Sequence, residues 1–342
     1  MVNPLKILLL ACGLLLAGCL RNEAPKIEVQ ELKGEIFGSY YIVKYRGDLA
    51  KEELQSMLNQ FFREFNDEFS TYQASSVISK FNQLGINEKL EVSPRFIEML
   101  KLAEKFYKET NGAFDPTLGP VIKAWGFGGG NKKETPSEAV LKAARGKVGF
   151  PFIKWDETKK TVWKEKAGLE LDVNAFAPGW AADLIGKMLT DNKVQDYMVD
   201  FSGDILFHGT KDGENLWVAG IETPSQKHNQ GVVTAVRMKN AAISTSGNYR
   251  QFFDEKGVKK SHIIDPRTGK PVTHNISSAS VIADTCVEAD AWSTAFMVLG
   301  PKGLDIANKN DIKVLLLEAK KTNLFEKLYS PSMSRFLEAH GL

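Results

Sequence analysis

The stretch from Ala241 to Gly300 constrains the fold most, because it sets three dense polar clusters between apolar runs. The clusters lie in AAISTSGNYRQFF, in SHIIDPRTGKPVTH and in SVIADTCVEADAWSTAFMVLG. The last is typical of a helix, on which Asp290 and Thr294 lie one turn apart on the same face. The middle one predicts a strand at Ile263-Ile264 that ends in the turn Asp265 to Gly269. A strand end with a His, near a helix with a carboxylate and a hydroxyl, suggests metal-assisted phosphate chemistry.

The composition is that of an ordinary globular protein. The 342 residues are 43% hydrophobic and 25% charged, with a formal net charge of +2. This length can bury a large core and favours two subdomains. The near balance of charge argues against a nucleic-acid-binding protein, which usually has a basic surplus. With only Cys12, Cys19 and Cys286, a disulfide framework and a Cys-rich zinc site are both excluded.

The N-terminus, residues 1–19, is predicted to be a targeting segment. Lys6 gives a short positive region, and residues 7–16 give an apolar region that is too short to span a bilayer comfortably. The tetrapeptide Leu16-Ala17-Gly18-Cys19 resembles the bacterial lipobox, in which cleavage leaves the cysteine as a lipid-bearing N-terminus. A plain secretory signal that contains a cysteine is the alternative.

Lipidation of Cys19 would anchor the protein to a bilayer. Residues 20–34 would then form a tether, and residues 35–342 would form the working domain. We therefore expect a lipoprotein of the bacterial cell envelope that faces the periplasm or the outside.

Hydrophobic periodicity predicts a mixture of helices and short strands without regular βαβ alternation. Helices are predicted over residues 49–65, 76–81, 94–109, 137–144, 177–188, 303–307 and 333–339. Strands are predicted over residues 35–46, 152–155, 161–164, 169–173, 197–199, 205–208, 216–221, 231–238 and 314–317. The pattern favours an α+β fold with mixed sheets over a doubly wound parallel sheet.

Two polar groups of the central stretch are candidates for chemistry. Asp290 and Thr294 offer the hard oxygen ligands that Mg²⁺ accepts, although a surface carboxylate beside a buried hydroxyl has the same spacing. His262, at the strand edge, is a candidate general base or phosphate partner, and a turn His that bonds a carbonyl is the alternative.

Other polar residues have simpler interpretations. Asp115, Asp172 and Asp204 each end an apolar run at a turn, where capping alone explains a carboxylate. The glycine-rich run Gly126 to Gly130 lacks the ending of a phosphate-binding P-loop, which favours a flexible connector. The hydroxyls of residues 244–246 lie outside a Gly-x-Ser-x-Gly elbow, so the signature of a serine hydrolase is missing.

Taken together, the motifs resemble the ApbE family of flavin transferases over essentially the whole mature chain. The matching stretches, in order, are Phe69-Ser70-Thr71-Tyr72, Gly112-Ala113-Phe114-Asp115-Pro116-Thr117, Asp172 to Asp183, Ser202-Gly203-Asp204, Thr245-Ser246-Gly247-Asn248-Tyr249, and Ser261 to Pro271 with Ala289-Asp290-Ala291 to Thr294. The SHIIDPRTG run and the pair Asp290 and Thr294 are the specific parts of this resemblance.

The resemblance implies two α+β lobes, related to the T-fold, with FAD in the cleft between them and Mg²⁺ at its pyrophosphate. It implies transfer of FMN to a threonine or serine hydroxyl of a partner protein, with release of AMP. The metal ligands would be Asp290, Thr294 and the backbone carbonyl of Ala175. His262 would take the proton of the attacking hydroxyl. The residues lining FAD would be Phe37, Tyr72, Ala113, Phe114, Asp115, Asp172, Pro178 and Ile264.

One position departs from the family pattern. The family usually has Asp-Leu-Gly-Gly-Ile-Ala-Lys-Gly where this chain has Asp172 to Gly179, so its Lys is replaced here by Pro178. Proline removes a charge and a backbone donor but suits the first turn of a helix. The change leaves open altered FAD affinity, hydrolysis of FAD instead of transfer, or a flavin carrier without turnover.

The flavin acceptor is expected to be another protein. The family's acceptor motif is roughly Asp-x-x-Ser/Thr-Gly-Ala-Ser/Thr, and no such run occurs in this chain. The partner would therefore be an exported or membrane-bound redox protein.

Overall fold

The structure is a computed structural model. It describes residues 28–127, 135–224, 231–248, 252–255, 258–321 and 324–340. The predictions for residues 1–19 with Cys19, for most of the glycine-rich run and for Tyr249 lie outside the described residues.

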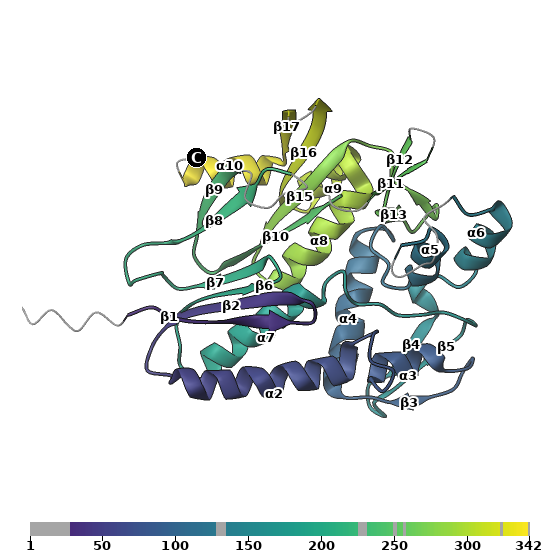
Figure 1. The fold of residues 1–342 in the computed structure, drawn as a ribbon, viewed down its shortest axis with the longest axis horizontal. Helices are drawn as coiled ribbons and strands as arrows, with labels where there is room; N and C mark the ends of the chain where they lie inside the picture. Colours follow the sequence, from purple (N-terminus) through teal and green to yellow (C-terminus); the bar gives the residue numbers. More distant parts are fainter. Residues whose placement is uncertain are drawn as a thin grey trace, which may run out of the picture.

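An antiparallel sheet of eight strands forms the centre of the molecule (Figure 1). In spatial order its strands are β1 (Gln30–Ile36), β2 (Ser39–Arg46), β6 (Asp196–Phe201), β7 (Asp204–His208), β10 (Ala241–Gly247), β15 (Ile276–Ala283), β16 (Lys313–Lys321) and β17 (Leu324–Tyr329). The α+β class is confirmed. The expected mixed sheets are wrong, because every pairing of described strands is antiparallel.

The first predicted strand, residues 35–46, is instead a hairpin. Phe37 and Gly38 form its two-residue turn with φ of 52° and 75°, and Ile36 pairs with Ser39. Positive φ at both positions matches the twist of the flanking strands. The predicted tether is too long, because residues 30–34 already pair within β1.

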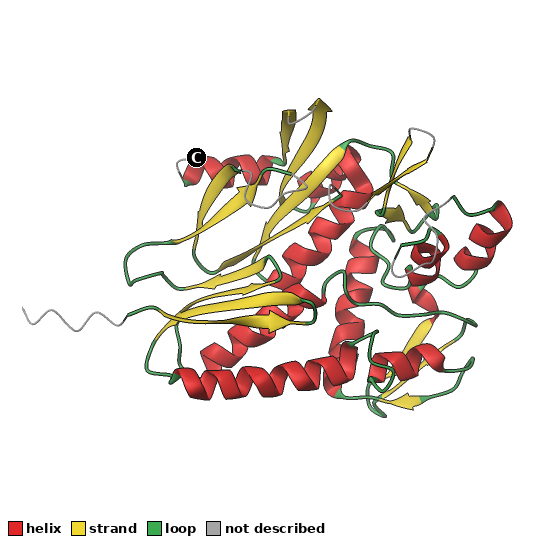
Figure 2. Cartoon of the chain, in the orientation of Figure 1, coloured by secondary structure: helices red, strands yellow, loops and turns green. Residues whose placement is uncertain are grey.

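Two helices cover one face of this sheet (Figure 2). They are α7 (Ala177–Asp191) and α8 (Cys286–Leu299), and they pack on the central strands and on each other. The long helix α2 (Lys51–Phe69) lies outside α7, where the rings of Phe65 and Phe69 lie 5.7 and 5.1 Å from the ring of Trp180. The sequence of α8 is apolar on nearly every side, so α8 is almost fully buried between its neighbours.

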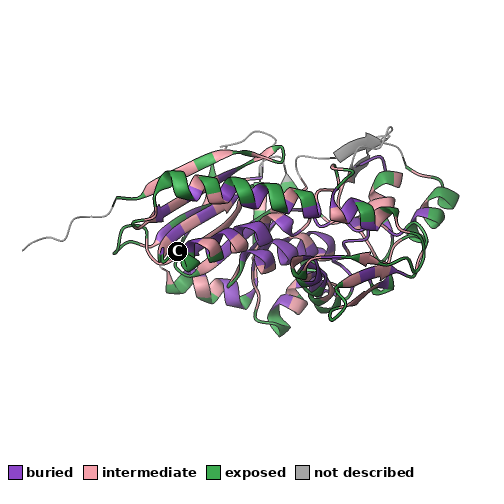
Figure 3. Ribbon diagram, turned by 90° about the horizontal axis from the view of Figure 1, so that it is seen from below, coloured by how far each residue is buried: buried purple, intermediate pink, exposed green. Residues whose placement is uncertain are grey.

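A smaller layer covers the opposite face. It consists of the hairpin β8 (Trp217–Glu222) and β9 (Val232–Met238) with the final helix α10 (Pro331–Ala339). These elements bury a separate apolar cluster with side chains from β7, β10 and β16. Figure 3 shows the resulting pattern, with buried residues in the interior and exposed residues on the outer faces of the helices.

The rest of the chain forms a second region beside the sheet, on the right of Figure 1. Its elements are α3 (Val77–Gln83), β3 (Leu90–Glu91), α4 (Pro94–Glu109), α5 (Gly119–Ala124), α6 (Glu138–Arg145), η1 (Phe150–Phe152), β4 (Ile153–Asp156), β5 (Thr161–Lys164), β11 (Phe252–Glu255), β12 (Val258–Ser261), β13 (Ile264–Asp265) and β14 (Lys270–Pro271). A short 3₁₀ turn, η2 (Gly300–Lys302), leads into α9 (Gly303–Lys309).

The strand predicted over residues 169–173 is wrong. Leu169, Leu171 and Val173 are buried, which produces the alternating pattern, but the segment pairs with no strand among the described residues. An extended segment that packs alternate side chains into a core has the same period as a strand.

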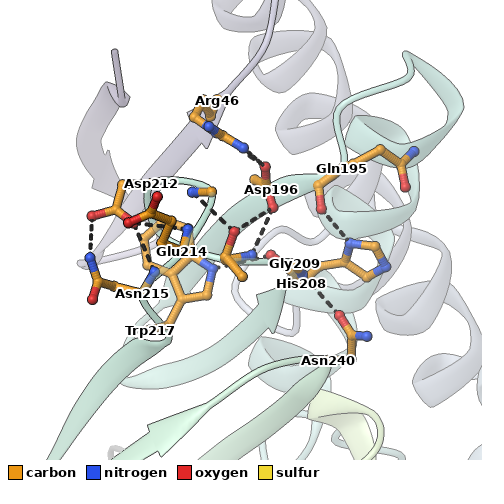
Figure 4. A network of polar contacts seen from close by, with 12 residues as sticks. Arg46, Gln195, Asp196, His208, Gly209, Asp212, Glu214, Asn215, Trp217 and Asn240 are labelled. Atoms are coloured by element: carbon orange, nitrogen blue, oxygen red, sulfur yellow. Dashed lines mark hydrogen bonds and ion pairs between the residues drawn. The ribbon is translucent and has the colours of Figure 1, made fainter. Parts of the chain in front are cut away.

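A polar network ties the start of β6 to the loop after β7 (Figure 4). Asp196 accepts hydrogen bonds from the Arg46 Nε (3.1 Å) and from the backbone N–H of Thr210 (2.7 Å). Gly209 has φ of +63°, and a Cβ there would lie 2.2 Å from the Asp196 carboxylate, so only glycine fits this approach.

We expect Asp196→Asn to destabilise the fold by about 1–3 kcal/mol at neutral pH, because it weakens bonds to a half-buried guanidinium. Burial alone would raise the pKa of Asp196, but the Thr210 N–H and the Arg46 guanidinium outweigh it and lower the pKa. A lowered pKa contributes stability above the unfolded value of about 4 that is lost on acidification. Urea unfolding of both proteins should therefore show a difference that shrinks from pH 7 to pH 3. A difference in unfolding free energy that stays constant with pH would show that the charge of Asp196 is not the cause.

Candidate functional site

The candidate site is built where α7 and α8 cross. Gly179, in the first turn of α7, makes the close approach possible. A Cβ at this position would lie 2.5 Å from the backbone oxygen of Cys286 and 2.7 Å from the Cβ of Asp290. Such distances leave no room for any other residue, so the Gly at position 179 fixes how closely the two helices pack.

The two helices cap each other. Neither Phe176 nor Thr285, the residues before them, makes a side-chain cap bond. Instead Asp290 of α8 accepts a hydrogen bond from the backbone N–H of Gly179 at 3.0 Å. Asp183 of α7 accepts hydrogen bonds from the backbone N–H groups of Cys286 and Val287, both at 2.8 Å. These bonds satisfy helix N–H groups that would otherwise lack partners and fix the position of α8 along α7.

The predicted metal ligands lie together at this crossing. The Thr294 Oγ1 lies 3.4 Å from the carbonyl oxygen of Ala175, just before α7. Asp290, one turn before Thr294 on α8, is 6% exposed. Two oxygens in adjacent positions around one Mg²⁺ lie about 3 Å apart at the usual Mg–O distance of about 2.1 Å. The separation and the all-oxygen donor set therefore fit Mg²⁺.

The charge around Asp290 also fits a cation. Burial and the neighbouring Asp204 raise the pKa of Asp290 well above its usual range, and the Gly179 N–H only partly opposes this. Burial raises the pKa of Asp183 to about 6 and that of Asp204 to about 7. Among the ion pairs of the described residues, none involves these three carboxylates. Unpaired buried carboxylates are costly, and a bound cation would relieve that cost.

The site is not a cluster of strong metal-binding side chains. In the part of the chain that the structure describes, no three His, Cys, Asp or Glu side chains are arranged to hold a metal ion. The group therefore depends on a single carboxylate together with two neutral oxygens. Such a set leaves coordination positions for water and phosphate, which is the usual way in which Mg²⁺ is held at nucleotides.

Asp115 and Asp172 lie on two loops that are bonded together. The backbone N–H of Asp172 donates to the carbonyl of Pro116 at 2.8 Å. The Asp115 carboxylate accepts from the N–H and hydroxyl of Thr117, at 2.8 and 2.6 Å. The Asp172 carboxylate accepts from the N–H of Asn174 at 2.9 Å. Both carboxylates thus cap turns, while burial raises the pKa of each.

The predicted FAD-lining residues differ strongly in exposure. Tyr72 is 91% exposed and Phe37 is 49% exposed, so both rings are available to a flat ligand. Phe114 is 1% exposed and packs against the rings of Phe106 and Phe176, and Ala113 is equally buried. The side chain of Phe114 thus belongs to the core, and only its backbone is open to a role at a ligand.

His262 and Ile264 lie beside α5. The ring of His262 meets the ring of Phe127 edge to face, with centroids 6.2 Å apart. Ile264 is buried in an apolar cluster with Trp125 and Phe127. The Trp125 Nε1 donates to the carbonyl of Gly269 at 2.9 Å, which fixes the predicted turn after Asp265. The strand β13 packs against α8, so this loop approaches the helix that carries Asp290 and Thr294.

Pro178 occupies the first turn of α7, as its chemistry predicts. The helix forms without the N–H that proline lacks, and the next N–H, from Gly179, donates to Asp290. The replacement of the family's Lys therefore leaves the helix crossing intact. It removes a positive charge beside the candidate site.

Asp183, Ser246 and Ser293 contribute to the site without having been predicted as site residues. Asp183 caps α8, and the hydroxyls of Ser246 and Ser293 lie 2.8 Å apart beside Thr294. The two-residue period of a strand through residues 244–246 would have placed Ser244 and Ser246 on one face. The role of Asp183 has no comparable local signal, because it depends on a helix 103 residues further along the chain.

Comparison with known proteins gives consistent matches. A sequence model of the ApbE family matches residues 37–316. The FAD:protein FMN transferase of Vibrio cholerae is 34% identical over 333 residues, covering 96% of this chain and 97% of that protein. The FAD:protein FMN transferase of Escherichia coli is 30% identical over 343 residues, covering 97% of each.

Solved structures match equally well. The apo form of the flavinyl transferase ApbE from Pseudomonas stutzeri has a TM-score of 0.83 at 30% identity, covering 90% of this chain and 96% of that chain. The flavin transferase ApbE from Vibrio cholerae has a TM-score of 0.81 at 32% identity, covering 91% of this chain and 99% of that chain.

Proposed function

This chain belongs to the ApbE family, and we propose that it is an FAD:protein FMN transferase, the activity for which its relatives are named. One observation carries the proposal. The Thr294 hydroxyl lies 3.4 Å from the Ala175 carbonyl where α7 and α8 cross, and Asp290, one turn before Thr294 on α8, is a buried carboxyl group whose pKa is raised by burial and by Asp204. Such a group suits a divalent cation at a pyrophosphate.

The proposed reaction is a displacement at phosphorus. The oxygen of a threonine or serine hydroxyl on a partner protein forms a bond to the phosphorus of the FMN half of FAD. The anhydride bond to the AMP phosphate breaks, and AMP leaves with the electron pair of that bond. The hydroxyl proton passes to His262. When bound, Mg²⁺ neutralises charge on the phosphate oxygens.

The chain's own residues hold the reactants in place. Asp290, Thr294 and the carbonyl of Ala175 would hold the cation, and the exposed rings of Phe37 and Tyr72 would contact the flavin or adenine. We propose that FAD lies between the eight-stranded sheet with its two helices and the region of α4 to α6, as in the predicted two-lobed arrangement. What supports this is that the FAD-lining candidates come from both parts.

The transfer test combines the purified protein, FAD, Mg²⁺ and a fragment that carries the acceptor motif. We expect release of AMP and a mass gain of one FMN on the fragment, with no mass gain on the protein itself. Free FMN with an unmodified fragment would instead indicate an FAD pyrophosphatase, and bound, intact FAD would indicate a carrier. Each of these two outcomes would overturn the transferase proposal.

Pro178→Lys is expected to tighten FAD binding several-fold, because it restores a positive charge near the pyrophosphate. The helix should tolerate the change, because the added N–H at this position needs no partner within the helix. Fluorescence titration of FAD checks this, with Pro178→Ala as the control that removes the ring without adding charge. Equal affinities for the Lys and Ala variants would show that the charge at this position has no effect on FAD.

We propose that the protein acts at the cell envelope, anchored through lipid on Cys19 and directed at an exported or membrane-bound redox partner. The supporting observation is the lipobox-like sequence Leu16 to Cys19. None of the helices in the described part of the chain is long and apolar enough to cross a membrane. Labelling with radioactive palmitate, compared between the natural protein and Cys19→Ala, tests the anchor.

A further inference from the structure

A line of hydroxyl groups lies behind Thr294, between α8 and β10. The Thr294 Oγ1 lies 3.3 Å from the Ser246 Oγ. The Ser246 Oγ lies 2.8 Å from the Ser293 Oγ, and the Ser293 hydroxyl donates to the backbone oxygen of Asp290 at 2.9 Å. Ser293 is fully buried, so this line is shielded from water at its inner end.

The hydrogen bond that Ser293 donates to Asp290 determines in which direction the other hydroxyls of this line donate. Since the single hydrogen of Ser293 is used on the carbonyl of Asp290, its oxygen accepts from the Ser246 hydroxyl at 2.8 Å, and the Ser244 Oγ lies 3.2 Å from the same oxygen. The single hydrogen of Ser246 is then directed at Ser293, and the oxygen of Ser246 faces Thr294 as an acceptor. Each hydroxyl therefore donates inward, away from the helix crossing.

This direction matters for a metal ligand. A hydroxyl that binds a cation uses an oxygen lone pair and must donate its hydrogen to another group. The Thr294 hydroxyl has two acceptors within reach, the carbonyl of Ala175 at 3.4 Å and the Ser246 Oγ at 3.3 Å. A cation held by both Thr294 and Ala175 would take up the lone pairs of these two oxygens, which would leave Ser246 as the acceptor for the Thr294 hydrogen.

We propose that Ser246 is a positioning residue for the cation site, which orients the Thr294 hydroxyl by accepting its hydrogen so that a lone pair faces the cation. This inference rests on the proposed function, because it assigns a supporting role within the cation site of that function. Groups that orient metal ligands by hydrogen bonds commonly change metal affinity by about 10–100-fold when removed.

The test measures Mn²⁺ binding, with Mn²⁺ as a spectroscopic substitute for Mg²⁺. Free Mn²⁺ is quantified by electron paramagnetic resonance in titrations of the purified protein with FAD, without acceptor protein. Ser246→Ala should raise the Mn²⁺ dissociation constant on the order of tenfold. Ser246→Thr keeps a hydroxyl and should restore binding to within about twofold of the natural protein, by the same argument.

Thr245→Val is the matched control. Thr245 is the neighbouring residue on β10 and points to the opposite face, where its hydroxyl lies 2.7 Å from the Ser280 Oγ. Removal of that hydroxyl should leave Mn²⁺ binding unchanged, even if it lowers the melting temperature. A loss of Mn²⁺ affinity in Thr245→Val equal to that in Ser246→Ala would overturn the inference, because both changes would then act through general stability.

Asp290→Ala separates failure of this inference from failure of the proposed function. If Asp290→Ala loses Mn²⁺ binding while Ser246→Ala retains it, the cation site stands and the role of Ser246 is wrong. If Asp290→Ala binds Mn²⁺ like the natural protein, the cation site itself is wrong. The expected result is loss in Asp290→Ala and intermediate affinity in Ser246→Ala.

Discussion

Asp290→Asn is expected to abolish metal-dependent transfer and, at the same time, to stabilise the metal-free protein. Asparagine keeps a carbonyl oxygen that can accept the hydrogen bond from Gly179, so the helix crossing should survive. The charge that would hold the cation is lost. Since a bound cation supplies several kcal/mol of stabilisation to charge at phosphorus, transfer should fall by about a thousandfold.

The gain in stability follows from the electrostatics of the crossing. Burial and Asp204 raise the pKa of Asp290 well above its usual range, so the folded protein favours the neutral form of this carboxyl group. A raised carboxyl pKa gives stability that is complete below the unfolded value of about 4 and is lost as pH rises. The natural protein without metal should therefore lose stability as the pH rises above about 4 and through the pKa values of about 6 for Asp183 and about 7 for Asp204.

The measurement pairs AMP release with thermal unfolding, with and without Mg²⁺, for the natural protein and Asp290→Asn. Mg²⁺ should raise the melting temperature of the natural protein but not that of the variant. Asp305→Asn, at an exposed position on α9, is the control for loss of one carboxylate elsewhere. Normal turnover of Asp290→Asn at low Mg²⁺ would show that the cation is held by other groups.

Local signals predicted the helices well. The predicted helix over residues 94–109 agrees with α4 at both ends, because Ser93 caps it by accepting from the N–H of Phe96 and proline begins it. The helix predicted over residues 177–188 continues to Asp191, three residues beyond the prediction. These features depend on neighbours within one or two turns, which a sequence displays directly.

The strands of the sheet were harder to predict. The hairpin at Phe37 and Gly38 lacks the common Asn-Gly signal, so residues 35–46 were predicted as one strand. The strands β15 and β17 were not predicted at all. Seven of the eight residues of β15 are buried, including three serines, of which Ser280 pairs its hydroxyl with that of Thr245 on β10. Such burial on both faces removes the alternation by which a strand is recognised.

Some residues of the site were indicated by local patterns in the sequence, and others depend on tertiary packing. The spacing of Asp290 and Thr294 indicated a shared helical face, and the structure places both at the crossing with α7. The carbonyl of Ala175 came only from the family resemblance, since a backbone oxygen carries no sequence signal. Asp183 and Ser246 act through contacts between distant segments, so their roles depend on tertiary packing that no local pattern records.

His262→Ala is expected to slow FMN transfer by about 10²–10⁴-fold, the usual contribution of a general base. The affinity for FAD should change by no more than about twofold, because the base acts on the attacking hydroxyl and gains its importance in the transition state. Single-turnover transfer, followed by mass spectrometry, gives the rate, and fluorescence titration gives the FAD dissociation constant. His340→Ala, after the final helix, controls for loss of an imidazole elsewhere.

Because of the position of His262, it is informative to measure the transfer rate and the FAD affinity separately. The residue lies against Phe127 and two residues before β13, a strand that packs on the helix of the cation site. A role in binding alone would follow from the same location, because Ile264 is also an FAD-lining candidate. The two roles differ in what they change: a binding residue alters affinity and rate together, whereas a base alters the rate at constant affinity. Equal losses in both quantities would therefore assign His262 to FAD binding and leave the proton acceptor to another group.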